Sequence, residues 1–356
     1  MKITVIGGGN IGTLMAAEFA HRGNSVSLYT SDPSKWRNDI TVNDELGNEL
    51  YIAHLDCISN SYDEVIPGAE YIFVAMPSFL YDGLAKKIVP LIEKGQKIGF
   101  VPGSGGAEFS FMNALDKGAI LFGLQRVHSI SRLESYGHSV NMLGRKSELQ
   151  VASIPRVYSS EISNDLERLF EIPCVSLSNY LTVTLTPSNP ILHTTRLYSM
   201  FKDMNKYDHN VLFYEEWTNA SSEMLFACDA ELQSVIKSIP ELDLSNVISL
   251  PIYYESHTPD QLTNKIKSIQ AFKGITSPML EVNGVWVPDY NSRYFTEDFP
   301  YGLQIIKQMA AFCNVDCPNI DKVLAWYKTI KANDKQFDFY NYGITNLTQV
   351  VEYNCK

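Results

Sequence analysis

His193 is the residue of this sequence that is best placed to exchange a proton near neutral pH. It follows Asn189 and Pro190, which fit the N-cap and the first position of a helix. His193 would then lie one turn into that helix, on the same face as Asn189. The positive end of a helix disfavours the imidazolium form, which suits a group that both donates and accepts protons. Taken alone, His193 also fits a structural histidine, and Asn189 also fits a cap with no further role.

A second group of reactive side chains lies much later in the chain. Residues 291–303 are dense in charged and aromatic side chains and precede another expected helix. Arg293 offers a planar fork that can hold a carboxylate through two hydrogen bonds. Asp298 offers a carboxylate that can hold a histidine ring in one tautomer and stabilise its cation. Together with His193, these residues predict proton transfer on a substrate that carries a carboxylate.

The N-terminus predicts a dinucleotide-binding turn. Gly7, Gly9 and Gly12 form a G-x-G-x-x-G pattern between an expected strand at 2–6 and an expected helix at 11–21. The pattern is weak alone, but its position between a strand and a helix makes it specific. The first glycine permits the tight turn, the second lets the backbone approach a diphosphate, and the third lets helix and strand pack closely. The residues expected to bind the cofactor here are Gly7, Gly9, Asn10, Ile11 and Gly12.

The end of the second expected strand bears on the choice between NAD and NADP. An acidic residue at this position normally holds the ribose 2′-hydroxyl of NAD. Here Thr30 and Ser31 follow the strand, and the first carboxylate is Asp32. Ser31, Lys35 and Arg37 could accept a 2′-phosphate instead, although both cations also fit a solvated surface. The sequence therefore predicts NADP or NAD, with NADP slightly favoured.

Two further loops follow strands that should neighbour the glycine turn. Pro77 and Ser78 follow an apolar strand at 69–75, and the glycine-rich loop 102–106 follows the next strand. In a doubly wound sheet the first of these positions faces the ribose and nicotinamide of the cofactor. Each loop either lines the site or is only a turn.

Alternating strands and helices fill the first half of the chain and predict a Rossmann domain. Such alternation is typical of right-handed βαβ units and a doubly wound parallel sheet. The expected strands are 2–6, 25–29, 69–75, 97–101 and 119–124, the expected helices are 11–21, 80–93 and 109–116, and a hairpin is expected to join 139–142 to 148–152.

The character of the sequence changes near residue 180. Long helical patterns follow, at 190–204, 211–239, 259–272, 301–313 and 320–331. We therefore expect an α/β fold with two domains: a Rossmann domain at 1–180 and a mainly α-helical substrate domain at 181–356.

Composition excludes several classes of function. The formal net charge of -11 disfavours binding to nucleic acid or to an anionic membrane. No apolar run reaches the ~18–20 residues that cross a bilayer, and the N-terminus lacks the apolar core of a signal peptide. The six cysteines show no zinc-binding spacing with histidine, so we expect reduced thiols, no metal and a cytoplasmic protein.

Three motifs together resemble the NAD/NADP octopine/nopaline (opine) dehydrogenase family. They are the glycine turn, Asn189-Pro190-x-x-His193 and Arg293-Tyr294-x-x-Glu297-Asp298-x-Pro300-x-Gly302-Leu303. The resemblance spans most of the chain, and the last motif is the most specific. The chain departs from the pattern at Thr194, where many members have a proline.

The resemblance implies a Rossmann domain joined to a helical domain, with substrate between them. It also implies NAD(P)H-dependent reduction of the imine formed between an α-keto acid and the amino group of an amino acid or other amine. The family's catalytic pair carries over to His193 and Asp298, and its substrate-carboxylate contact carries over to Arg293. Ser104 lies in a loop that should approach the keto acid, and Asn189 is a further expected substrate contact.

Two other functions stay open at this point. A ketopantoate-reductase-like enzyme shares the plan of a Rossmann domain followed by helices. Such enzymes use a lysine on a helix of the second domain as the acid, and here the first lysine of that helix is Lys202. A non-catalytic NAD(P)-binding sensor would not need His193, Arg293 and Asp298 to meet. The expected partners are small-molecule substrates, and a homo-oligomer is compatible with the sequence.

Overall fold

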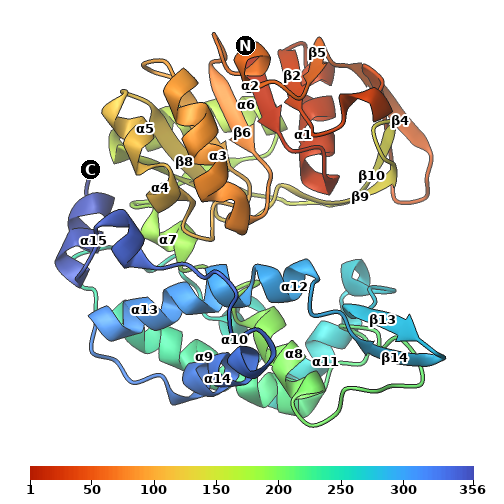
Figure 1. The fold of residues 1–356 in the computed structure, drawn as a ribbon, viewed down its shortest axis with the longest axis vertical. Coiled ribbons are helices and arrows are strands. Elements are labelled where there is room, and N and C mark those ends of the chain that lie inside the picture. The colour runs from red at the N-terminus through yellow and green to blue at the C-terminus, as the bar shows by residue number, and fades with distance from the viewer. The chain divides into compact units, whose positions relative to one another are not determined.

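The computed structural model describes residues 1–356 and divides into two compact units. One unit consists of Met1–Thr184 together with Glu352–Lys356, and the other of Leu185–Val351. Figure 1 shows a sheet flanked by helices in the first unit and mainly helices in the second. The functional division at residue 180 stays a prediction. Glu352–Lys356, which that division gives to the second domain, pack with the first unit.

The main sheet of the first unit has eight strands. Their spatial order is β12 (Cys174–Ser176), β11 (Leu149–Ile154), β8 (Ile120–Leu124), β7 (Lys97–Phe100), β6 (Tyr71–Val74), β1 (Lys2–Ile6), β2 (Ser25–Tyr29) and β5 (Cys57–Ser59). All neighbours run parallel except β11, which is antiparallel to β8. Strands β6 and β8 are buried along their whole length, as expected for parallel strands that helices cover on both faces. The predicted doubly wound Rossmann class is confirmed.

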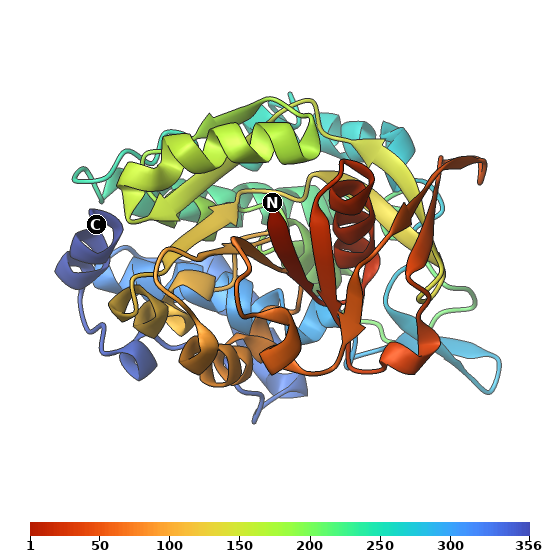
Figure 2. The same ribbon diagram turned by 90° about the horizontal axis from the view of Figure 1, so that it is seen from above.

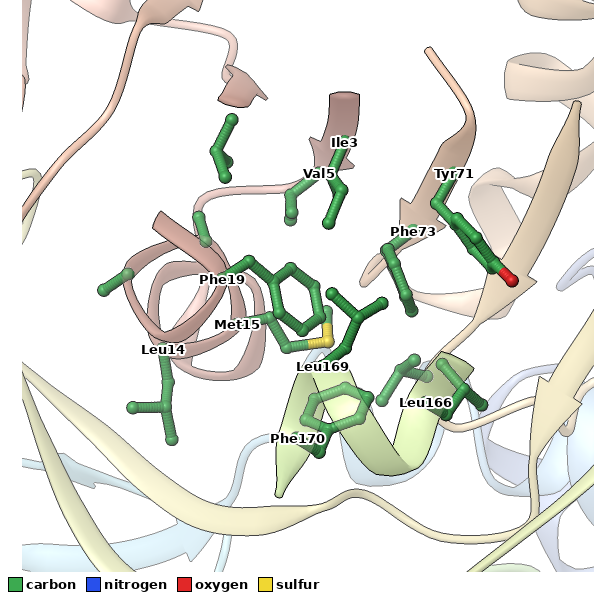
Figure 3. Close-up of a cluster of buried hydrophobic side chains, with 14 of the residues drawn as sticks. Ile3, Val5, Leu14, Met15, Phe19, Tyr71, Phe73, Leu166, Leu169 and Phe170 are labelled. Carbon is green, nitrogen blue, oxygen red and sulfur yellow. The ribbon is translucent and has the colours of Figure 1, made fainter. Parts of the chain in front are cut away.

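Helices cover both faces of this sheet. They are α1 (Asn10–His21), α2 (Tyr62–Val65), α3 (Tyr81–Ile88), α4 (Ala107–Ser110), α5 (Met112–Asp116), α6 (Ser159–Phe170) and α7 (Leu181–Thr184). Figure 2 shows α1 and α6 over one face and α3 to α5 over the other. On the first face, the ring of Phe19 lies 4.8 Å from that of Phe73 and 5.0 Å from that of Phe170 (Figure 3). On the other face, Phe100 packs on Phe111 at 4.9 Å.

A second, smaller sheet corrects one prediction. Its strands, in spatial order, are β4 (Glu49–His54), β3 (Asp39–Asn43), β10 (Ser139–Arg145) and β9 (Ser129–Ser135). The predicted hairpin between 139–142 and 148–152 is wrong, because β10 pairs with β9 and β3 whereas β11 pairs with β8 and β12. A tighter turn at Gly137, with φ +78°, joins β9 to β10, and the shorter connection forms the hairpin.

The second unit is mainly helical, as predicted. Its elements are α8 (Leu192–Phe201), α9 (Asn219–Lys237), α10 (Leu250–Tyr253), α11 (Pro259–Ser268), the hairpin of β13 (Met279–Val282) and β14 (Val285–Pro288), α12 (Arg293–Thr296), α13 (Gln304–Phe312), α14 (Pro318–Ile330) and the start of α15 (Leu347–Asn354). The helix predicted at 211–239 begins only at Asn219, because Thr218 caps it by accepting the N–H of Ser221. The residues before Thr218 form a loop instead.

A carboxyl group is fully buried in the first unit. Glu108 lies in α4, and its side chain accepts a hydrogen bond from the hydroxyl of Thr184. Its second oxygen, Oε2, has no hydrogen-bond partner. The Tyr353 hydroxyl donates to the backbone oxygen of Glu108 at 2.7 Å. Burial raises the pKa of Glu108 to about 8, and the hydrogen bond from Thr184 opposes that rise.

We expect Glu108→Gln to reduce the dependence of stability on pH. The folded pKa of about 8 lies above the unfolded value. The neutral carboxyl therefore stabilises the fold fully below about pH 4.3, and this contribution is lost as the pH rises through the folded pKa. Glutamine stays neutral, so the variant should lose less free energy of unfolding than the parent between about pH 5 and about pH 8. Denaturant unfolding across this range measures the difference. Glu352→Gln, at an exposed site, is the matched control, and parallel curves for parent and Glu108→Gln would contradict the expectation.

Candidate active site

The glycine turn has the geometry that a diphosphate needs. Gly7 has φ +113°, and its N–H donates to the backbone oxygen of Tyr29 at 3.0 Å. A Cβ on Gly12 would lie 1.8 Å from the Gly7 oxygen, so only glycine lets α1 start this close to the turn. A Cβ on Gly9 would project into open space. The first N–H groups of a helix have no acceptor within the helix, so the space beside Gly9 suits an anion.

Asn10 and Ile11 open α1, and Asn10 also ties the helix to the second sheet. The Asn10 Oδ1 accepts the N–H of Leu133 at 2.8 Å, and its backbone oxygen accepts the Ser131 hydroxyl at 3.0 Å. The side-chain oxygen of Asn10 is therefore used within the fold. A contact of Asn10 or Ile11 with a cofactor would most simply come from the backbone N–H groups.

The indole ring of Trp36, which no sequence motif indicated, lies against the turn. A Cβ on Gly8 would lie 2.3 Å from Cζ2 of Trp36, so this glycine makes room for the ring. Trp36 packs edge-on against Tyr136, whose hydroxyl lies 2.9 Å from Oγ1 of Thr30. The hydroxyl of Thr30 is thus engaged, whereas Ser31 is exposed. The only sign of this contact in the sequence was Gly8 itself, because a third glycine between Gly7 and Gly9 leaves room for a bulky neighbour.

The charges after β2 partly compensate one another. The Lys35 ammonium lies 3.1 Å from the Asp32 carboxylate, which also accepts the Ser34 hydroxyl at 2.5 Å. The hydrogen bonds from Ser34 and Lys35 lower the pKa of Asp32. Arg37 is exposed and has no ion pair. Asp32 lies in the same loop as Lys35 and Arg37, and the preference for NADP over NAD stays a prediction.

The other predicted residues of the first unit follow neighbouring strands. Strand β6 pairs with β1, and a Cβ on Gly7 would lie only 2.6 Å from the oxygen of Ala75, directly after the end of β6. The residues that follow β6, Pro77 and Ser78, therefore begin beside the glycine turn. Pro77 is half-buried and Ser78 is buried. Ser104 is half-buried in the loop after β7. Their contacts with cofactor or substrate stay predictions.

In the helical unit, three side chains from distant parts of the sequence form one hydrogen-bonded chain. The Nδ1 of His193 lies 2.8 Å from Oδ2 of Asp298, and its Nε2 lies 3.0 Å from the hydroxyl of Tyr214. The Asp298 carboxylate accepts from Nδ1, which fixes the neutral ring as the Nδ1–H tautomer. The hydroxyl of Tyr214 then donates to Nε2. The structure thus brings the predicted pair together, and Tyr214 was missed because it lies in the loop that the sequence predicted as helix.

The start of α8 differs from the predicted one. The helix begins at Leu192 rather than Pro190, and no side chain caps it, so Asn189 is not the N-cap. Instead a turn precedes the helix: the Asn189 oxygen accepts the N–H of His193 at 3.1 Å. Asn189 is exposed, and its contact with substrate stays a prediction.

The motif around His193 and the motif around Asp298 are in contact at Pro190 and Gly302. A Cβ on Gly302 would lie 2.9 Å from Cγ of Pro190, so the glycine lets the two segments approach closely. Asp298 directly precedes the π-helical turn Phe299–Leu303, whose last N–H donates to the Asp298 backbone oxygen at 2.8 Å. This turn presents the carboxylate of Asp298 to His193.

Arg293 is placed differently from its predicted role. Its Nε and Nη2 donate to one oxygen of Glu297 at 3.0 and 2.6 Å, one turn along α12. The side chain of Arg293 is 68% exposed, whereas that of Glu297 is 18% exposed. A substrate carboxylate would therefore compete with Glu297 for the guanidinium. The predicted substrate contact of Arg293 stays a prediction.

The chain has neither a cluster of metal-binding side chains nor a helix that could cross a membrane. No three or more histidine, cysteine, aspartate or glutamate side chains are grouped so that they could hold a metal ion. None of the helices has the length and apolar character that crossing a membrane requires.

Known proteins resemble both parts of the chain. Residues 176–331 match the model of the NAD/NADP octopine/nopaline dehydrogenase alpha-helical domain, and residues 2–103 match that of the NAD-dependent glycerol-3-phosphate dehydrogenase N-terminus. The octopine dehydrogenase of Mizuhopecten yessoensis is 27% identical, over 92% of this chain and 89% of that protein. The chain is therefore similar to the octopine and opine dehydrogenases along most of its length.

Further relatives show the same similarity. The tauropine dehydrogenase of Arabella iricolor is 24% identical, over 93% of this chain and 92% of that protein. A structure of octopine dehydrogenase with NADH and L-arginine has a TM-score of 0.85 at 24% identity, over 98% of this chain and 97% of that one. The predicted resemblance is confirmed, as are the NAD(P) cofactor and the class of an NAD(P)-dependent oxidoreductase of the opine dehydrogenase type.

Proposed function

We propose that this opine dehydrogenase joins an α-keto acid to the amino group of an amino acid or other amine, with His193 and Asp298 as the acid–base pair. The observation that carries the proposal is the 2.8 Å contact between His193 Nδ1 and Asp298 Oδ2, inside the motifs of the family. The carboxylate fixes the tautomer of the ring and stabilises its cation.

In this proposal the His193 imidazole donates or accepts the proton at each proton transfer of the condensation. Attack of a neutral amine on the keto carbon gives a carbinolamine, and loss of water from it needs a proton on the departing oxygen. The His193 imidazolium supplies that proton, and the neutral ring can take one from the substrate ammonium group beforehand. A nicotinamide cofactor held at the turn of Gly7, Gly9 and Gly12 would supply the hydride for reduction of the imine carbon. The reverse, oxidative direction uses the same groups in the opposite order.

The remaining predicted contacts complete the proposal. Arg293 would hold a substrate carboxylate after giving up its hydrogen bonds to Glu297. A guanidinium can donate the same pair of hydrogen bonds to either carboxylate. Asn189 and Ser104 stay proposed substrate contacts of their respective units. A cytoplasmic location and a homo-oligomeric state also stay predictions.

The position of Lys202 does not support the ketopantoate-reductase-like alternative. Lys202 lies just beyond the last residue of α8, whereas His193 lies in its first turn. The Lys202 ammonium pairs with Asp203 at the surface. The helix therefore presents a histidine and no lysine beside Asp298.

A substrate panel tests the proposal. Oxidation of NADH and of NADPH is followed with pyruvate and other α-keto acids, each with and without amino acids and amines such as L-arginine, taurine and L-alanine. We expect turnover only when keto acid and amine are both present. Turnover with a keto acid alone would support the reductase alternative. Cofactor binding without turnover in any combination would support the sensor.

A further inference from the structure

The nitrogen of His193 that must exchange protons is covered by a second side chain. Asp298 occupies Nδ1, so only Nε2 remains for proton exchange. The hydroxyl of Tyr214 lies 3.0 Å from that Nε2. Any proton that moves between His193 and a substrate must therefore pass through the Tyr214 hydroxyl or wait until that hydroxyl moves away.

Packing of the phenol ring argues against movement. Tyr214 is 6% exposed, and the ring of Phe272 stacks on it at 4.0 Å with the planes at 17°. The neighbouring Phe213 is fully buried and lies 4.9 Å from the Tyr214 ring. A side chain enclosed in this way changes rotamer only when its neighbours also move.

The backbone on both sides of Tyr214 is anchored by one buried arginine. Arg196 is 2% exposed; its Nε donates to the oxygen of Phe213 at 3.1 Å, and its Nη2 to that of Glu216 at 2.8 Å. Burial lowers the pKa of Arg196 to about 10, so the guanidinium stays charged at neutral pH. Hydrogen bonds from a buried charged donor are strong and costly to break.

Helix α8 therefore sets the distance between the His193 imidazole and the Tyr214 hydroxyl. Arg196 follows His193 by one turn of α8 and holds the loop that carries Tyr214. His193 and the Tyr214 hydroxyl are thus fixed to one rigid element.

We propose that Tyr214 is a catalytic proton relay between His193 and the substrate. In the acid step, the Tyr214 O–H bond breaks as its proton goes to the departing substrate oxygen. The Nε2–H bond of the imidazolium breaks at the same time, and its proton goes to the Tyr214 oxygen. The net change is one proton moved from His193 to the substrate, with Tyr214 unchanged. The role in turnover rests on the proposed function, whereas the hydrogen bond does not.

Nitrogen NMR of the His193 imidazole tests the hydrogen bond without turnover. We expect Tyr214→Phe to shift the Nε2 resonance of neutral His193 and to leave Nδ1, bonded to Asp298, nearly unchanged. An Nε2 resonance that is the same in parent and variant would show that the bond does not form and would overturn the relay, whatever the substrate panel gives.

Steady-state kinetics test the relay with the substrates that the panel identifies. We expect Tyr214→Phe to lower kcat by about 10²-fold, within the range of proton-transfer groups, with KM changed by less than about threefold. In mixtures of light and heavy water, kcat of the parent should curve with deuterium content because two protons move together. The variant should give a straight line if one proton moves.

Tyr198→Phe is the matched control. Tyr198 is a buried tyrosine of α8 that packs on Trp326 at 5.6 Å, and its hydroxyl makes no hydrogen bond. We expect this variant to keep the parental kcat. A kcat of Tyr214→Phe that equals or exceeds that of the parent would mean that the phenol is a spectator or a gate. If no substrates turn over, the proposed function fails, and the NMR result still decides whether Tyr214 holds Nε2.

Discussion

Replacement of His193 by alanine should lower kcat by about 10²–10⁴-fold, the usual contribution of a positioned acid–base group. The variant loses the only imidazole that contacts Asp298. The glycine turn that should hold the cofactor lies in the other compact unit, so the affinity for NAD(P)H should stay within about twofold of the parent, a difference well below 1.4 kcal/mol. Rates with the best substrate pair and fluorescence titration of the cofactor measure the two quantities.

His257→Ala provides the comparison for this variant. His257 is an exposed histidine of the same unit, and it should be replaceable without effect on kcat. If His193→Ala keeps more than about a tenth of the parental rate, the acid–base role of His193 is wrong.

Gly12→Ala should have the second large effect, on the cofactor rather than on proton transfer. The new Cβ would lie 1.8 Å from the backbone oxygen of Gly7, and neither backbone segment can yield as a side chain would. Overpacking of this kind costs about 1–3 kcal/mol. If that strain is relieved by moving α1 away from the turn, the affinity for NAD(P)H should fall about tenfold to hundredfold. Titration with NADH and with NADPH measures the loss.

Gly83→Ala separates this effect from a general effect of adding a methyl group. Gly83 is an exposed residue of α3, and a Cβ there would meet nothing within 4 Å. Alanine should stabilise that helix by about 0.5–1 kcal/mol and leave cofactor affinity unchanged. Parental affinity in Gly12→Ala would contradict the role given to the close contact with Gly7.

Local patterns predicted the Rossmann unit well. The apolar residues of β1, the glycines after it and the first turn of α1 are adjacent in sequence, so their spacing alone carries the structure. The hairpin around Gly144 was wrong because two strands next to one another in sequence joined different sheets. Pairing between strands depends on the whole sheet, and a single segment does not contain that information.

The site of the helical unit needed more than local pattern. Nothing between His193 and Asp298 indicates that they meet, and the link came from the family motifs. Tyr214 has no motif of its own, and the loop that carries it looked like the start of a helix. Its position depends on Arg196, a charge that the sequence would place at the surface but that the structure buries among backbone oxygens. Such long-range hydrogen bonds become visible only in three dimensions.

The return of Glu352–Lys356 to the first unit makes the helical unit an insertion rather than an appendage. The polypeptide leaves the Rossmann unit after Thr184 and re-enters it at Glu352, so the two units are tethered by two covalent crossings. A fragment that ends at Thr184 would lack Tyr353 and leave the backbone oxygen of Glu108 without its donor. A tag or truncation at the C-terminus would likewise disturb the nucleotide-binding unit first, although the residues directly before Glu352 belong to the helical unit.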